Sequence, residues 1–396
     1  MNYKPLLGLY YENKSEYESV YKSRFFGENC VHLNFKIHEN EAFYCITEEM
    51  HKLYIKILEL NADVLHKLSA LPGIAPKQFA KRSLIEEIVL TNNIEGVFST
   101  RKEIGSVLES LKNGDKKKRF FGLVKKYNML ASEEIPLKVP EDIRKVYNEL
   151  VLPEIAADDP QNIPDGELFR KDGAEVTSKT QKVIHIGVYP EAKIISSIEK
   201  ALSILNSDLS PIERISIFHY LFGYIHPFYD GNGRTSRFIS SYLLAKELNN
   251  RLIGYRMSYT IKENLSAYYN AFKLCNDPKN RGDITPFILM FMDIIYKSMD
   301  NLQKALHERI QKLHFFSDKM AALPYFQTEA MQNFGFLLIQ ARLFAEHGIT
   351  KKELEQNLEI GTVTLDKRLK IVREAGLLLE ERVERRLYFK FDIDKL

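Results

Sequence analysis

The amino-acid sequence predicts a mainly helical protein with a short β-hairpin and a helix-and-hairpin segment at its C-terminus. Over most of the chain apolar residues recur at intervals of three and four, which is the helical period. Short β-branched runs occur in the Pro- and Gly-rich stretch 151–191 and again after residue 376. The composition, with 45% hydrophobic and 28% charged residues over 396 positions, is typical of a globular protein with several cores.

Three helices are expected in the first part of the chain. Over 49–71 the apolar residues that share one helical face are Leu53, Ile57, Leu60, Val64 and Leu68. Pro72-Gly73 ends that helix, and further helices are expected at about 77–92 and 99–111. Residues 1–40 show no sustained period and receive no assignment.

The middle of the chain combines one expected hairpin with several expected helices. Two β-branched runs within 175–187 predict the hairpin. Ser210 and Glu213 around Pro211 predict a capping box at the start of a helix. The helices expected here run from Pro211 to Ile225, from Thr235 onward, and over 262–276 and 284–312.

The C-terminal segment has the element order of a winged helix. Helices are expected at 329–347, 350–358 and 363–375, followed by two alternating runs at 377–381 and 386–391. We therefore expect three regions: an N-terminal helical region 1–110, a core 111–312 and a winged helix-turn-helix domain 313–396.

The composition of the chain argues against several classes of protein. The net charge of +3, from 56 basic and 53 acidic residues, is too balanced to indicate a nucleic-acid-binding protein. Three dispersed cysteines indicate neither a disulfide framework nor a zinc site. No run of 18 apolar residues and no signal-peptide pattern are present. The sequence predicts a cytoplasmic protein without a membrane partner.

The segment from His226 to Arg237, HPFYDGNGRTSR, combines the residue types that hold a nucleotide polyphosphate beside a base. The Gly231-Asn232-Gly233 turn allows backbone N–H groups to form an anion nest, and the following helix adds its positive dipole end. Asp230 can hold Mg²⁺ on phosphate oxygens. The imidazole of His226 can accept a proton at neutral pH.

Two arginines complete this segment. Arg234 and Arg237 lie three residues apart on one helical face, so both can fork onto the same polyphosphate. Phe228 is expected to point into the core and fix the loop. A GNG turn alone is an ordinary connector, and a histidine before proline is usually a packing residue. The combination in this order is what indicates function.

HPFYDGNGRTSR resembles the signature of the Fic family, H-P-F-x-D/E-G-N-G-R-x-x-R, at every fixed position, and the likeness spans roughly 40–312. The resemblance implies a Fic-fold helical core whose hairpin is a flap. It implies transfer of AMP from ATP to a Ser, Thr or Tyr hydroxyl of a target protein, with His226 as base and Asp230 as Mg²⁺ ligand. The nucleotide-binding residues that it implies are Gly231, Asn232, Gly233, Arg234, Thr235 and Arg237.

Thr91-Asn-Asn-Ile-Glu95-Gly96 resembles the inhibitory motif of the family, S/T-x-x-x-E-G/N. The resemblance implies that Glu95 pairs with Arg237 and keeps the γ-phosphate from its productive position. In several inhibited members the same glutamate aligns a water for AMP removal. The alternative is that this hexapeptide is an ordinary helix end, since Asn and Gly commonly terminate helices.

The resemblance also implies partners. The target protein is expected to dock on the flap at 175–187, Asn276 is expected to contact adenine, and the protein is expected to modify itself. Two alternatives stay open: the protein could form a homodimer, and the nucleotide donor could be another compound such as UTP or CDP-choline. The rival function is a nucleotide-sensing regulator that binds DNA through its winged helix. Residues 342–396 hold 12 Lys/Arg and 11 Asp/Glu, so a solvated helix or a dimer contact explains that charge equally well.

Overall fold

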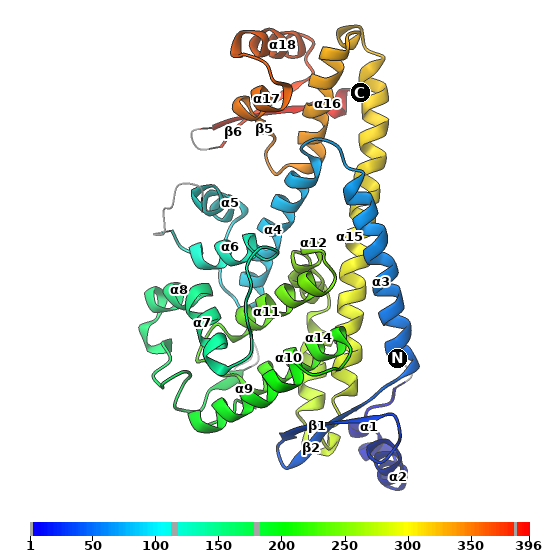
Figure 1. Cartoon of the computed structure of the whole chain (residues 1–396), viewed down its shortest axis with the longest axis vertical. Helices are drawn as coiled ribbons and strands as arrows, with labels where there is room; N and C mark the ends of the chain where they lie inside the picture. Colours follow the sequence, from blue (N-terminus) through cyan, green and yellow to red (C-terminus); the bar gives the residue numbers. More distant parts are fainter. Residues whose placement is uncertain (1–2, 112–117, 178–182, 384–385) are drawn as a thin grey trace. The chain divides into compact units, whose positions relative to one another are not determined.

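The computed structural model describes residues 3–111, 118–177, 183–383 and 386–396, and these residues are mainly helical (Figure 1). The mainly helical fold class expected from the sequence is confirmed, and the winged-helix assignment of its C-terminal part stays a prediction. The chain divides into two compact units, Met1–Asn61 with Glu86–Met299, and Ala62–Ile85 with Asp300–Leu396. The boundaries fall within or near three helices, α3 (Glu48–Ser69), α4 (Ala75–Ile94) and α15 (Thr285–Ala321). The division at residues 110 and 312 stays a prediction.

The first unit begins with four elements that the sequence left unassigned: α1 (Leu6–Glu12), α2 (Lys14–Phe25), β1 (Cys30–Ile37) and β2 (Asn40–Cys45). The two strands form an antiparallel hairpin with a register shift between His32 and Lys36. Leu33, Phe35 and Ile37 are buried at alternate positions of β1. This alternating pattern of buried residues is short and interrupted. It lacks the helical spacing of three and four residues by which the other elements were predicted from the sequence.

Five helices and the expected hairpin follow in the first unit: α5 (Arg101–Ser110), α6 (Phe121–Asn128), α7 (Pro140–Leu150), α8 (Leu152–Asp158) and α9 (Glu191–Leu205), with β3 (Glu175–Thr177) and β4 (Val183–Ile186) before α9. The two strands pair antiparallel, which confirms the predicted hairpin at its described residues. The tip of that hairpin, 178–182, lies outside the described residues.

The helices that carry the signature segment are α10 (Pro211–Ile225) and α11 (Asn232–Glu247), which pack against each other. Helices α12 (Arg251–Gly254), α13 (Met257–Glu263) and α14 (Leu265–Cys275) complete this part. The capping box predicted for α10 is wrong, because the side chain of Ser210 caps no N–H. Glu213 instead accepts a 2.8 Å hydrogen bond from the buried hydroxyl of Tyr44.

The second unit contains the C-terminal elements in the expected order: α16 (Glu329–Phe344), β5 (Ile349–Thr350), α17 (Lys351–Leu358), α18 (Thr362–Glu374), β6 (Leu378–Val383) and β7 (Arg386–Phe391). The three strands form a sheet in the order β5-β7-β6. Its core includes the fully buried residues Phe344, Leu354, Leu365 and Phe391. Among the described helices, none combines the length and the apolar character needed to cross a bilayer.

Phe228 anchors the loop between α10 and α11 in the core of the first unit. Its side chain is 0% exposed, and its ring stacks on Tyr147 of α7 with centroids 3.7 Å apart. Phe169 packs edge-on at 5.5 Å. The inward orientation expected for Phe228 is confirmed, and the loop is fixed by aromatic packing from two other segments.

Replacing Phe228 with Ala should lower the free energy of unfolding by about 3–5 kcal/mol, because truncation of a buried aromatic leaves a cavity. A urea titration followed by circular dichroism measures this change. Phe98, which is 77% exposed, provides the matched control, and Phe98→Ala should change stability by less than about 0.5 kcal/mol. Equal effects of both variants would contradict the anchoring role.

Candidate active site

His226 ends α10 in the left-handed conformation, with φ 51° and ψ 63°, and its N–H donates to the carbonyl of Phe222 at 2.9 Å. This conformation is uncommon for a residue with a side chain, and it turns the chain abruptly into the signature loop. Burial, then the nearby cation Arg170 and His185, lower the pKa of His226 to about 4. The imidazole is therefore neutral at pH 7 and able to accept a proton.

Arg170 is a site residue that sequence analysis missed. The side chain is completely buried, and its Nε donates to the carbonyl of His226 at 2.9 Å. Its Nη2 donates to the carbonyls of Val188 at 2.9 Å and Ile225 at 3.3 Å. One guanidinium thus joins the end of the flap to the loop that carries His226. Arg170 stands in an irregular segment, where an arginine is ordinarily exposed, and no sequence signal distinguished it.

The turn at Gly231 requires glycine. Its φ is +79°, and a Cβ at this position would lie 2.9 Å from the Cδ1 atom of Ile155. Helix α11 begins directly afterwards, at Asn232, three residues earlier than expected. The first N–H groups of α11 have no partner within the helix, so they form a site for an anion together with the helix dipole.

The side chains of Asn232 and Thr235 hold this turn together. The amide of Asn232 accepts from the N–H of Phe228 at 2.9 Å and donates to the carbonyl of Phe228 at 2.7 Å. The hydroxyl of Thr235 donates to the carbonyl of Gly231 at 2.8 Å. Both residues were expected to bind nucleotide. In the structure their side chains are engaged by the loop itself, which leaves backbone N–H groups as the donors to an anion.

The two arginines of the signature pair with different carboxylates. Arg234 is buried and donates to Glu154 of α8 at 2.7 Å, with Asp230 at 3.8 Å. Arg237 donates to Glu95 at 2.8 Å. In this arrangement each guanidinium is held by a carboxylate, and the expectation that both fork onto one polyphosphate stays a prediction. Glu154 has a raised pKa because of burial, partly offset by Arg234.

Glu95 lies directly over the start of α11. A Cβ on Gly233 would lie 2.8 Å from Oε2 of Glu95 and closer still to Oε1, so a larger residue here would displace this carboxylate from its present position. Thr91, one turn earlier on α4, receives two further hydrogen bonds from Arg237, at 2.8 Å on its hydroxyl and 3.0 Å on its carbonyl. The structure thus brings together Thr91, Glu95, Gly233 and Arg237, which the sequence places in two distant segments.

Glu87 is a second site residue that sequence analysis missed. It is completely buried on α4, and it accepts hydrogen bonds from the N–H of Ser258 at 2.9 Å and from its hydroxyl at 2.6 Å. Burial raises the pKa of Glu87 to about 7, although Ser258, Arg237 and Arg256 oppose this rise. Its contacts fix the part of α4 that presents Glu95.

Asp230 has the features expected of a ligand for a hard cation. Its side chain is 44% exposed, and it accepts a hydrogen bond from the N–H of Gly231. The described residues contain no cluster of three or more His, Cys, Asp or Glu side chains suited to a metal. Mg²⁺ commonly binds through one or two carboxylates together with phosphate oxygens and water, and Asp230 could supply such a carboxylate.

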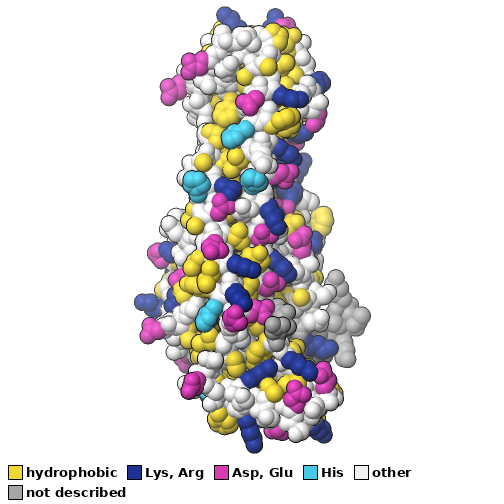
Figure 2. All heavy atoms as spheres, turned by 90° about the vertical axis from the view of Figure 1, so that its right-hand side faces the viewer, with side chains coloured by type: hydrophobic (Ala, Val, Ile, Leu, Met, Phe, Trp, Pro, Cys, Tyr) yellow, Lys and Arg dark blue, Asp and Glu magenta, His cyan; other side chains and the backbone are white. Residues whose placement is uncertain are grey.

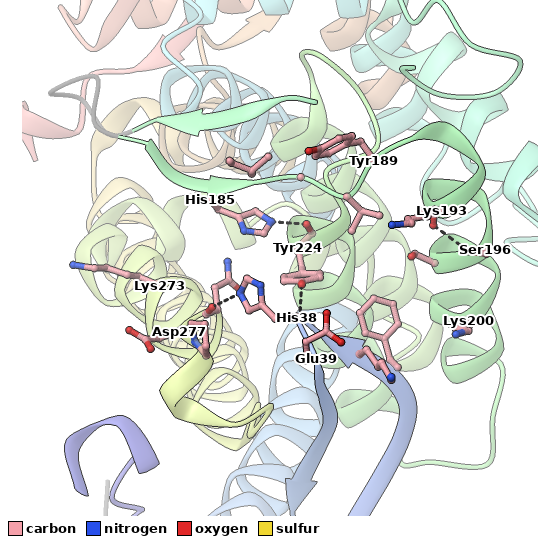
Figure 3. Close-up of a pocket in the computed structure, with 18 residues that line it drawn as sticks. His38, Glu39, His185, Tyr189, Lys193, Ser196, Lys200, Tyr224, Lys273 and Asp277 are labelled. Carbon is pink, nitrogen blue, oxygen red and sulfur yellow. Dashed lines mark hydrogen bonds between the residues drawn. The ribbon is translucent and has the colours of Figure 1, made fainter. Parts of the chain in front are cut away.

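A pocket of about 1010 Å³ lies beside the flap (Figure 3). Its walls come from the end of β4, from α9, from the β1–β2 turn and from the end of α14. A Cβ on Gly187 at its rim would lie 2.9 Å from Cβ of His226, so this wall adjoins the histidine. Asn276, expected to contact adenine, lines the pocket, and its Oδ1 accepts a hydrogen bond from Tyr220 at 2.8 Å.

Part of this chain is similar in sequence to known proteins. Residues 138–244 match the Fic/DOC family. Proteins named protein adenylyltransferase Fic from Drosophila virilis and Drosophila melanogaster are each 38% identical over 95 residues, 24% of this chain. The matched stretch spans 18% and 17% of the length of these two relatives.

A solved structure of a Fic family protein from Desulfovibrio desulfuricans G20 is 18% identical and superposes with a TM-score of 0.49, covering 88% of this chain and 97% of the other. A structure of Fic-1 from C. elegans is also 18% identical, with a TM-score of 0.45 over 76% of this chain and 81% of that one. The match over 138–244 includes the whole segment from His226 to Arg237. We conclude that the chain carries a Fic/DOC family domain over residues 138–244.

Proposed function

We propose that this protein is a self-inhibited adenylyltransferase that moves AMP from Mg·ATP to a Ser, Thr or Tyr hydroxyl of a target protein. One observation carries the proposal: a neutral histidine, an anion nest and the ion pair Arg237–Glu95 meet at the junction of α10 and α11. The first two features are what a phosphoryl-type transfer needs, and the third is what would block it.

The proposed reaction uses His226 as the general base. Its neutral imidazole removes the proton from the target hydroxyl, and the oxygen attacks the α-phosphorus of ATP. The bond to the β-phosphate oxygen breaks, so pyrophosphate leaves and AMP becomes an ester of the target. Backbone N–H groups at the start of α11 stabilise the charge on the α-phosphate. Asp230 would hold Mg²⁺, which offsets phosphate charge when bound.

Inhibition follows from the position of Glu95. Its carboxylate covers Gly233 and neutralises Arg237 at 2.8 Å. A γ-phosphate brought to the same place would meet a like charge, and it would find the Arg237 guanidinium occupied. With ATP excluded from its productive position, the α-phosphorus is not presented to the target hydroxyl.

Removal of AMP is the second activity that we propose for this site. Glu95 is a carboxylate at the mouth of the nest, with its side chain 24% exposed. It can accept a proton from a water that attacks the phosphorus of the AMP ester, so that AMP is released and the departing side-chain oxygen takes up a proton to become a hydroxyl again. The same carboxylate would thus oppose AMP transfer and support AMP removal.

The rival function, a DNA-binding regulator, gains no support from α18. Arg373 pairs with Glu380 at 2.6 Å, and Asp366 of this helix pairs with Lys351 at 2.6 Å. Figure 2, which faces the side of Figure 1 that carries α15, shows basic and acidic side chains interspersed over the described residues there as well. Charge of this kind suits contact with protein or solvent better than contact with phosphates. We still propose that residues 313–396 form a winged helix. We do not propose that this domain binds a nucleic acid.

The pH dependence of AMP transfer tests the role of His226. Because the active form is neutral and the pKa is lowered to about 4, activity should be level above about pH 5.5 and should decline as pH falls toward 4. Steady-state rates of labelled-AMP incorporation by the Glu95→Gly variant give this profile. His226→Ala should lose about 10²–10⁴-fold in rate but keep ATP binding. A midpoint near 6.5, or loss of ATP binding, would contradict the assignment.

Asp230→Ala should abolish the dependence of ATP affinity on Mg²⁺, because the carboxylate is assigned to the ion. Isothermal titration with and without magnesium measures this dependence. Asp165, an exposed carboxylate bonded to the hydroxyl of Tyr229, provides the control, and Asp165→Ala should keep the magnesium effect. Persistence of the effect in Asp230→Ala would remove the proposed metal role.

Glu95→Gly should raise AMP transfer by at least about tenfold, since it frees Arg237 and opens the space over Gly233. The same variant should lose AMP removal, so the two activities must change in opposite directions. Labelled-AMP incorporation and release measure them separately. Asn93→Gly is the matched control, because Asn93 is exposed on the same turn of α4 and makes no contact with Arg237 among the described interactions.

Arg237→Ala separates the inhibitory pair from the nucleotide clamp. It breaks the pair with Glu95 but also removes a cation for phosphate, so it should not reproduce the activation. A double variant with Glu95→Gly should behave as Arg237→Ala alone. Activation by Arg237→Ala equal to that of Glu95→Gly would show that Arg237 serves only inhibition.

A further inference from the structure

We propose that Cys30 and Cys45 form an intramolecular disulfide when the protein meets a low-molecular-weight disulfide such as oxidised glutathione. The two thiols stand on neighbouring strands, β1 and β2, and neither takes part in the chemistry proposed for the active site. Both are free in the structure, as is Cys275. This disulfide is a modification site outside the active site, and its formation does not depend on AMP transfer.

The pairing register places the two cysteines directly opposite each other. Cys30 of β1 is the Cα partner of Cys45 of β2, and these strands run antiparallel. The adjacent pair is joined by a hydrogen bond, since the N–H of Ile46 donates to the carbonyl of Asn29 at 2.9 Å. Bonded and non-bonded pairs alternate in an antiparallel ladder, so Cys30 and Cys45 form a non-bonded pair. The N–H of Cys45 accordingly donates away from β1, to the hydroxyl of Thr285 at 2.9 Å.

A non-bonded antiparallel pair has the spacing that a disulfide needs. In such a pair the Cα atoms typically lie about 4.5 Å apart, and both side chains leave the sheet on the same face. Disulfides in proteins join residues whose Cα atoms are about 4.4–6.8 Å apart. Formation of the bond between Cys30 and Cys45 therefore requires rotation of the side chains and little movement of the backbone.

Both thiols share one hydrophobic cluster, where the β1–β2 hairpin lies next to α1 and α2 (Figure 1). Cys45 is part of the buried cluster together with Leu6 and Phe43, and Cys30 packs against the same cluster. Cys45 is 8% exposed, whereas Cys30 is only half-buried. Cys30 is therefore the thiol that a dissolved disulfide reaches first. Its Sγ also lies 3.6 Å from Nε2 of His32, which is on the same face of β1.

The reaction is a thiol–disulfide exchange in two steps. The thiolate of Cys30 attacks one sulfur of the small disulfide, which forms a mixed disulfide and releases one small thiolate. The thiolate of Cys45 then attacks the sulfur of Cys30, which forms the bond between the two cysteines and releases the second small thiolate. The protein gives up two electrons and two protons, and one small disulfide is reduced to two thiols.

The surroundings of the pair make this exchange slow at neutral pH. Burial, then the neighbouring Cys45, Asp283 and Glu41, raise the pKa of Cys30 to about 12. Burial also raises the pKa of Cys45, although the nearby cation Arg24 opposes this rise. Because the thiolate is the attacking form, the rate of exchange should increase about tenfold for each pH unit between about pH 7 and 9.

The disulfide would close the hairpin at the end opposite its turn. The register shift within β1 locally disrupts the ladder between the two strands. Strand β2 is also held by the core, because the N–H of Phe43 donates to the carbonyl of Gly282 at 3.0 Å. Strand β1 leads into the turn, where Nε2 of His38 donates to the carbonyl of Asn276 at 2.8 Å beside the pocket (Figure 3). A covalent bond to β2 would therefore hold this wall of the pocket in place.

Peptide mapping of the full chain tests the site. The protein is incubated with oxidised glutathione at about pH 8.5, the remaining thiols are alkylated, and mass spectrometry identifies the linked peptides. The expected product contains a bond between Cys30 and Cys45 and has a mass about 2 Da below that of the reduced chain. A glutathione mixed disulfide that persists on Cys30, or alkylation of both thiols, would overturn the proposal.

Matched variants locate the bond and test its effect on the hairpin. Cys30→Ser should abolish the product, whereas Cys275→Ser should keep it, because Cys275 is buried in α14. In the oxidised chain, hydrogen exchange of the amides in 31–44 should be at least about tenfold slower than in the reduced chain. The same treatment should leave exchange in Cys30→Ser unchanged. Equal exchange in the oxidised and reduced chains would contradict the proposed hold on the pocket wall.

Discussion

The buried guanidinium of Arg237 is the constraint on which the rest of the site depends. It is 2% exposed, and a charge in such a position must be paired and hydrogen-bonded. Thr91 of α4 and Glu95, which directly follows that helix, supply three of its contacts. Leaving a buried charge without partners typically costs about 3–5 kcal/mol, so α4 is drawn to the start of α11. In the proposed function, a polyphosphate replaces Glu95 there.

The signature loop is shaped by several small constraints that act together. Phe228 fixes the loop in the core, and the amide of Asn232 bonds both the N–H and the carbonyl of Phe228. Gly231 accepts a backbone conformation that other residues rarely adopt, and Gly233 leaves space for one carboxylate. Arg170 ties the same loop to the flap. The elements that hold His226 are therefore the elements that would position the target.

Much of this arrangement could be predicted from the sequence, for identifiable reasons. Helical periodicity is strong in α3 and α10, and the residue types from His226 to Arg237 indicate their chemistry without a structure. Helix α7 also carried a signal, since Pro140 begins it and its buried residues Ile143, Val146, Tyr147 and Leu150 follow the helical period. That signal was overlooked because the preceding residues are irregular.

Other features depend on contacts that no local pattern encodes. Glu154 pairs with Arg234 across 80 positions, and Glu87 bonds Ser258 across 171. Both carboxylates lie on helices where a glutamate is ordinarily solvated. The side chains of Asn232 and Thr235 were expected to face the nucleotide. Residue type alone does not reveal that both side chains are hydrogen-bonded within the loop itself. Arg170 was missed for the same reason.

The central claim is that Glu95 occupies the place of a nucleotide phosphate at the start of α11. A crystal structure of the Glu95→Gly variant with Mg²⁺ and a non-hydrolysable ATP analogue tests it most directly. The account predicts the polyphosphate against the N–H groups at Gly233, with a phosphate oxygen bound to Arg237 and the α-phosphorus facing His226. A polyphosphate bound elsewhere, with Arg237 still held by α4 alone, would contradict the account.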